Sequence, residues 1–295
     1  MPTQTALMRT ALTSLLLVFS LVGNATATAP ALSADVRATA HSIDGSIAVY
    51  ARAMDGRRPL VSFRASERFP AASIIKMLIM VTAFDAAERN PALMHRLVIV
   101  HAADMVGGSE FLAGVQPGAR FPLATLVYHM ITQSDNTAAN ALISYFGFDR
   151  INAEGAKLGL THTALKRHFL DFTAIVKHND NVTSAEDMGR LLYAIERGAR
   201  EALTTVASPQ ACRRMIAIML GQEDRDKIPA GLPAGVRVAN KTGEITGVRN
   251  DVAIVDPYGD NPYVIAILTK HLDNYATGLR AIRRISGDVY RAVTP

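Results

Sequence analysis

Strand patterns lie near both ends of this chain, and helical patterns fill the long interval between them. Short runs rich in β-branched and aromatic residues predict strands at Ser46–Tyr50, Leu60–Phe63, Val236–Ala239, Val252–Val255 and Tyr263–Leu268. Recurring apolar residues predict helices at Ile74–Ala87, Leu123–Gln133, Thr137–Phe146, Ser184–Arg197, Pro209–Leu220 and Tyr275–Val293. The order implies an α/β fold of the α+β kind, with one antiparallel sheet built from both ends and flanked by helices, plus an all-helical lobe.

This order divides the chain into two expected lobes. Residues 28–68 and 222–295 form a sheet-containing α/β lobe, and residues 69–221 form a helical lobe. No internal repeat or low-complexity linker interrupts them. A crevice between two lobes is a usual place for a ligand site.

Residues 1–27 have the features of a secretory signal peptide. Arg9 supplies a positive charge, and Ala11–Val22 is apolar but too short to cross a bilayer. Ala25–Ala27 then offers a small-residue cleavage site. We therefore expect export to a bacterial periplasm or to the cell exterior, with no membrane span after cleavage.

Charge and cysteine content exclude several other classes of protein. The net charge is +5, from 31 Lys and Arg against 26 Asp and Glu, and the basic residues are scattered, which argues against nucleic-acid binding. Cys212 is the only cysteine, so an intramolecular disulfide is impossible. The histidines lack the paired spacing of metal ligands. We expect a monomer that uses no metal or cofactor and acts on a small molecule.

A serine and a lysine three residues apart open the first long helical pattern. Ser73 and Lys76 lie in the sequence Ser-Ile-Ile-Lys. Positions i and i+3 share a face of a helix, so the Lys76 amine is expected to reach the Ser73 hydroxyl and activate it as a nucleophile. Lys76 must be neutral to act as a base, which requires burial or a neighbouring cation such as Lys241.

Two further motifs supply polar groups for the same chemistry. Ser134 and Asn136 lie in Ser-Asp-Asn between two helical patterns, where a hydroxyl can relay a proton and an amide can bind a substrate amide. Lys241, Thr242 and Gly243 lie on a predicted strand. The lysine and threonine can bind a substrate carboxylate, and the glycine allows a substrate backbone to approach.

Two residues beyond the third motif are also candidates. The backbone N–H near Glu244 can form an oxyanion hole together with that of Ser73. Arg249 opens the next predicted strand and is either a second carboxylate ligand or a surface residue.

Three longer stretches surround these motifs. They are Phe69–Lys76 (FPAASIIK), Gln133–Asn140 (QSDNTAAN) and Val238–Val255 (VANKTGEITGVRNDVAIV). Together they resemble the serine β-lactamases and penicillin-binding proteins, and most closely the class A β-lactamases. The resemblance implies a two-lobed fold of that superfamily, with the site at the lobe junction.

The resemblance also implies roles for individual residues. Ser73 would carry the acyl group, and Lys76 and Ser134 would handle protons. Asn136, Lys241 and Thr242 would bind substrate. The expected substrate is a β-lactam or a peptidoglycan-like small molecule.

The chain departs from the class A pattern in one place. Class A enzymes carry a glutamate in an E-x-x-L-N pattern, which activates the water that releases the acyl group, and residues 165–187 contain no such pattern. Arg167 matches an arginine of that loop, and the next acidic residue is Asp171, which is shorter and shifted. The acylating groups are therefore complete, while the group that catalyses deacylation is unassigned.

These observations support three functions of different kinds. The first is a serine hydrolase that hydrolyses the amide of β-lactams through an acyl-enzyme at Ser73. The second is a D-alanyl-D-alanine carboxypeptidase, transpeptidase or esterase on the same fold, which lacks efficient β-lactam turnover. The third is a binding or sensor domain without catalysis, which would not need a nucleophile and two proton carriers.

Overall fold

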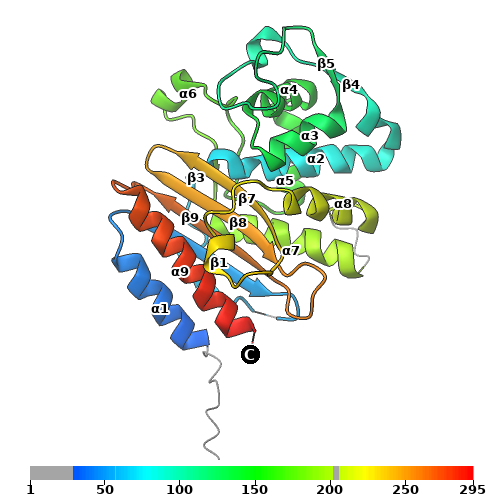
Figure 1. Ribbon diagram of the computed structural model, residues 1–295. Coiled ribbons are helices and arrows are strands. Elements are labelled where there is room, and N and C mark those ends of the chain that lie inside the picture. The colour runs from blue at the N-terminus through cyan, green and yellow to red at the C-terminus, as the bar shows by residue number, and fades with distance from the viewer. Residues whose placement is uncertain (1–28, 57, 202–205, 295) are drawn as a thin grey trace, which may run out of the picture.

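A five-stranded antiparallel sheet forms the centre of the computed structural model, which describes residues 29–56, 58–201 and 206–294. The strand order is β2-β1-β9-β8-β7 (Figure 1). The strands are β1 (Ser46–Ala53), β2 (Val61–Phe63), β7 (Val238–Ile245), β8 (Val248–Val255) and β9 (Tyr263–Lys270). The prediction of one sheet shared by both ends of the chain is confirmed. The expected signal peptide, 1–27, lies outside the described residues.

The sheet is buried on both faces, so the side chains of each strand alternate between two cores. On β1, Val49 packs into one core and Tyr50 into the other. The first core lies beneath two helices from the ends of the described chain, α1 (Ala29–His41) and α9 (Tyr275–Val293), which run side by side in Figure 1. The second core continues into the helices of the middle of the chain.

Seven helices occupy the middle of the described chain. They are α2 (Lys76–Arg89), α3 (Leu123–Thr132), α4 (Asn136–Phe146), α5 (Phe148–Lys157), α6 (Phe172–Val176), α7 (Ala185–Glu201) and α8 (Pro209–Leu220). The predicted helices all form, and α5 and α6 are additional. Among the described residues, no helix has the length and apolar character needed to cross a membrane. The lobe boundaries given above stay a prediction.

Short strands and 3₁₀ turns complete the described structure. The strands are β3 (Phe69–Pro70), β4 (Leu97–Ile99), β5 (Arg120–Pro122) and β6 (Val182–Thr183). The turns are η1 (Ala72–Ile75), η2 (Pro91–His95), η3 (Ala102–Asp104) and η4 (Pro229–Gly231).

Helix α2 is enclosed almost completely by other elements. Every residue from Lys76 to Phe84 is buried, and a helix that is apolar all round is a core helix. Its first residue, Lys76, is therefore held deep in the molecule. Ser73 was expected to open this α-helix, but it lies in the preceding 3₁₀ turn η1, which begins at Ala72 with a left-handed φ of 46°.

The contact between α7 and β1 offers a test of this packing. A Cβ added at Gly189 would overlap the ring of Tyr50. We expect Gly189→Ala to destabilise the fold by about 1–3 kcal/mol through overpacking, even though alanine favours a helix by about 1 kcal/mol. Urea unfolding measures the change. In the control Gly107→Ala the new Cβ comes no closer than 3.8 Å to a described neighbouring atom, on Leu170. Equal stability of the two variants would contradict the packing.

Candidate active site

The three sequence motifs meet around one hydroxyl. Ser134, in the junction between α3 and α4, places its Oγ 3.2 Å from Lys76 Nζ and 3.0 Å from Lys241 Nζ. Lys76 begins α2, and Lys241 lies on β7. Ser73 lies in the turn that leads into α2. The packing of η1 against β7, the edge strand of the sheet, brings these distant parts of the sequence together.

The absence of a side chain at Gly243 allows β7 to run directly beside η1. A Cβ there would lie 3.0 Å from the backbone nitrogens of both Ser73 and Ile74. The glycine was expected to let a substrate backbone approach the strand. In the structure, it lets the protein's own backbone at η1 approach the strand. This approach brings the backbone of Glu244 next to Ser73, and both residues line the two cavities described below.

The Ser134 junction is held in an unusual backbone conformation. Ser134 has a left-handed φ of 60°, which costs on the order of 1–3 kcal/mol for a residue with a side chain. The buried Asp135 stabilises the junction, because its carboxylate accepts hydrogen bonds from Ala138 N at 2.8 Å and Leu112 N at 3.1 Å. Asp135 is thus the N-cap of α4.

Lys76 is fully buried and directs its amine at the second motif. Its Nζ donates to Ser134 O at 2.6 Å and to Asn136 Oδ1 at 2.8 Å. Burial, and then the nearby charge of Lys241, lower the pKa of Lys76 well below its ordinary value. Among the described residues, no hydrogen bond joins Lys76 to the hydroxyl of Ser73, which corrects the contact expected from their spacing.

Lys241 is the second buried amine of the site. Its Nζ donates to Thr242 O at 2.8 Å as well as to Ser134. Burial lowers the pKa of Lys241 to about 7. Burial also raises the pKa of Asp251, on the neighbouring strand β8, to about 7. The site therefore contains two amines that lose their protons more easily than a lysine in water.

An aromatic ring, rather than a carboxylate, lies beside Lys76 on the loop before α6. The Phe169 ring centroid is 4.4 Å from Lys76 Nζ, and the side chain is almost completely buried. Asn140 fixes this part of the loop, because its Oδ1 accepts from Phe169 N at 2.7 Å and its Nδ2 donates to Phe169 O at 3.3 Å. Phe169 lies in none of the sequence motifs, so no pattern in the sequence predicted its place in the site.

Asp171, the acidic residue that the sequence offered for deacylation, has a different role. Its carboxylate accepts a hydrogen bond from Ala174 N at 3.0 Å, so Asp171 is the N-cap of α6. It lines neither cavity at Ser73. The neighbouring Arg167 is also structural, because its Nε donates to Asp180 Oδ1 at 2.8 Å.

Two cavities open on either side of Ser73. The larger, of about 420 Å³, is shared by the second and third motifs and is lined by polar groups that include Ser134, Asn136 and Thr242. The smaller, of about 260 Å³, lies on the loop side, and its apolar lining consists of Ala72, Phe169, Leu170, Phe172, Ile175 and Ile245. The site thus has one polar side and one apolar side.

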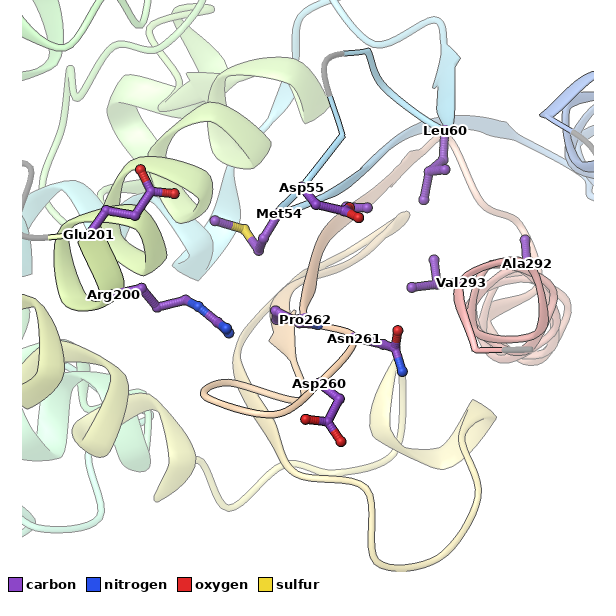
Figure 2. A pocket seen from close by; sticks show the side chains of 11 residues that line it. Met54, Asp55, Leu60, Arg200, Glu201, Asp260, Asn261, Pro262, Ala292 and Val293 are labelled. Atoms are coloured by element: carbon purple, nitrogen blue, oxygen red, sulfur yellow. The ribbon is translucent and has the colours of Figure 1, made fainter.

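A third cavity, also of about 420 Å³, lies where β8 turns into β9. Figure 2 shows Arg200, Asp260 and Asn261 around it, near the end of α9. Among the residues that the structure describes, its lining contains no serine and shares no residue with the cavities at Ser73. We therefore do not assign it to the same chemistry.

Comparisons with known proteins agree with this geometry. A family model described as "Beta-lactamase enzyme family" matches residues 31–293. A β-lactamase from Proteus vulgaris is 28% identical over 216 residues, which cover 70% of this chain and 75% of the relative. The carbapenem-hydrolysing β-lactamase KPC of Klebsiella oxytoca is 28% identical over 235 residues, which cover 77% and 76%.

Solved structures are similar over most of the chain. The structure of PBP-A matches with a TM-score of 0.80 at 27% identity, covering 88% of this chain and 95% of PBP-A. A leucine-to-glutamate mutant of PBP-A, solved as an acyl-enzyme complex with penicillin G, matches equally well. A β-lactamase from Sphaerobacter thermophilus matches with a TM-score of 0.77 at 28% identity, covering 89% and 96%.

These matches confirm the fold and the family resemblance that the motifs indicated. The family model spans almost all of the described residues, including the three motifs. The chain therefore belongs to the β-lactamase enzyme family and is an enzyme of its serine hydrolase type.

Proposed function

We propose that this protein forms an acyl-enzyme at Ser73 with β-lactams and related amide or ester donors, and that water releases the acyl group slowly. The observation that carries the proposal is the Phe169 ring, 4.4 Å from Lys76 Nζ, where a carboxylate would be needed to activate water. The acyl donors are small molecules of the β-lactam or peptidoglycan-like kind, and the protein is exported to the periplasm or cell exterior.

The acylation step requires the Lys76 amine to turn from Ser134 and Asn136, its partners in the structure, towards the Ser73 hydroxyl. Neutral Lys76 accepts the proton of the Ser73 hydroxyl as its Oγ bonds to the donor carbonyl carbon. The negative charge on the carbonyl oxygen is stabilised by the backbone N–H groups of Ser73 and Glu244, which β7 brings together. The lowered pKa of Lys76 supports this role, because a lysine with an ordinary pKa would be protonated near neutral pH.

Loss of the leaving group uses Ser134. Its hydroxyl donates a proton to the leaving nitrogen or oxygen as the carbonyl bond to that atom breaks, and it regains a proton from Lys76 or Lys241. The Asn136 amide, together with Lys241 and Thr242, holds the donor in the polar cavity.

Deacylation lacks a comparable group. A water molecule that attacks the acyl-enzyme needs a base and polar partners to orient it. The loop-side cavity is lined mainly by apolar side chains. Among the described residues that line it, Glu244 carries a carboxylate, and this carboxylate already pairs with Lys227 and Arg249.

A second candidate function, efficient β-lactam hydrolysis, is favoured by the relatives that are named β-lactamases.

The first prediction concerns the adduct itself. We expect the purified protein to gain the mass of one penicillin G on Ser73 within minutes and to keep it for much longer, because acylating groups are present and a deacylating base is not. Intact-protein mass spectrometry over time measures both rates. Ser73→Ala should remain unlabelled. Rapid turnover of nitrocefin without a lasting adduct would favour the second candidate function.

The second prediction concerns the position of Phe169. We expect Phe169→Glu to speed loss of the Ser73 adduct by roughly 100-fold or more, the usual contribution of a positioned general base. The same carboxylate would raise the pKa of Lys76, so acylation should become slower at neutral pH. Loss and gain of the adduct are measured separately by mass.

Phe169→Gln is the matched control for this prediction. It introduces a polar side chain of similar length that cannot act as a base, and it opens the same space to water. If Phe169→Gln accelerates deacylation as much as Phe169→Glu, the ring blocks water sterically and the missing base is not the limiting feature.

The third prediction concerns the coupling between the two buried lysines. Below pH of about 7, Lys241 keeps its charge and thereby lowers the pKa of Lys76. We expect Lys241→Met to raise the pKa of Lys76, and so to shift the rising limb of the acylation rate to higher pH by about one pH unit. A penicillin methyl ester is the donor, because it has no carboxylate for Lys241 to bind. If the rising limb of the acylation rate moves to lower pH in Lys241→Met, the coupling between Lys241 and Lys76 is contradicted.

A further inference from the structure

The side chain of Glu244 forms ion pairs at the mouth of the polar cavity. Glu244 Oε1 lies 2.6 Å from Lys227 Nζ and 3.5 Å from Arg249 Nε. The carboxylate is 42% exposed, and the residue lines both cavities at Ser73. One carboxylate oxygen of the protein thus occupies the space between two cations at the candidate active site.

Both cations are fixed in place. Lys227 is 2% exposed and also pairs with Asp224 at 2.5 Å. Burial opposes its charge, but the hydrogen bonds to Asp224 and Glu244 outweigh burial and raise the pKa of Lys227. The Arg249 guanidinium lies 4.0 Å from the centre of the Tyr275 ring and donates to Val248 O at 3.0 Å. Neither cation needs a ligand to complete its contacts.

The remaining charge in the cavity is mostly negative. Its described lining contains four carboxylates, from Glu110, Glu223, Asp224 and Glu244. Lys241, the cation beneath it, donates to Ser134 Oγ and Thr242 O. A carboxylate that entered from solvent would meet like charges first and would find the candidate cations already paired.

We propose that Glu244 determines which donors the site accepts, because its carboxylate occupies the position at which a donor carboxylate would pair with Arg249 and Lys227. This assignment rests on the proposed acylation of Ser73. The preferred donors are amides or esters whose leaving-group side is uncharged or cationic. A donor with a free carboxylate on that side has to displace Glu244 before it can bind.

Penicillin G and its methyl ester test this assignment, because they differ only in that carboxylate. The second-order rate constant for labelling Ser73 is measured with each donor by intact-protein mass spectrometry. We expect the wild-type protein to react faster with the ester. Glu244→Gln should raise the rate with penicillin G by roughly 10-fold or more, the scale of a relieved like-charge contact, and should lower the ratio of the ester rate to the penicillin G rate by a similar factor.

Glu223→Gln is the matched control. It removes the same unit of charge from the same cavity, but Glu223 makes no ion pair among the described residues. If it raises the rate with penicillin G as much as Glu244→Gln does, the total negative charge of the cavity selects donors and the assignment of Glu244 is wrong. Glutamine can still accept a hydrogen bond from Lys227, and urea unfolding verifies that the variant remains folded.

Two further outcomes would also overturn the assignment. Equal wild-type rates with the acid and the ester, together with an unchanged ratio in Glu244→Gln, would overturn the role of Glu244 while the acylation of Ser73 stands. Labelling by neither donor would overturn the proposed function, and the role of Glu244 with it.

Discussion

Two lysine amines buried around one serine hydroxyl are the constraint on which the rest of this structure depends. Lys76 and Lys241 are both fully enclosed, and Ser134 Oγ lies within 3.2 Å of each. A buried ammonium is costly unless it is well paired, so the position of each amine has to be fixed. Each is held on an element that packs into a core. Lys76 begins the enclosed helix α2, and Lys241 lies on a strand of the central sheet.

Much of the fold could be predicted from local pattern, because most of its elements follow the ordinary periods of helices and strands. Strand β7 was the exception. Its polar residues Asn240, Lys241 and Thr242 are buried, so the apolar pattern stops at the point where the strand becomes part of the site. The strand runs to Ile245, beyond the end of the apolar run at Ala239, and includes Lys241, Thr242 and Gly243, which were expected to lie on a strand.

The candidate site could be predicted as a set of motifs but not as a set of contacts. The spacing of Ser73 and Lys76 predicted that both lie on one face of an α-helix. Ser73 instead lies in a 3₁₀ turn, and hydrogen bonds direct the Lys76 amine to Ser134 and Asn136. Phe169 carries no signal in its own segment, because its importance comes from a long-range contact with α2. Asp171, in contrast, was visible in the sequence as an acidic residue, but its carboxylate acts locally as the N-cap of α6.

In the proposed function, the two cavities at Ser73 separate the tasks of forming and releasing an acyl-enzyme. The polar side contains Ser134, whose hydroxyl contacts both buried amines, so a donor bound there lies next to the proposed proton carriers. The other side offers water mainly apolar side chains, and its described carboxylate, Glu244, is already paired. Phe169 controls that side, and Glu244 controls the charge of the other. Both side chains lie outside the three motifs, so under the two proposals the motifs supply the acylation chemistry while these neighbours decide which donor enters and how long its acyl group remains.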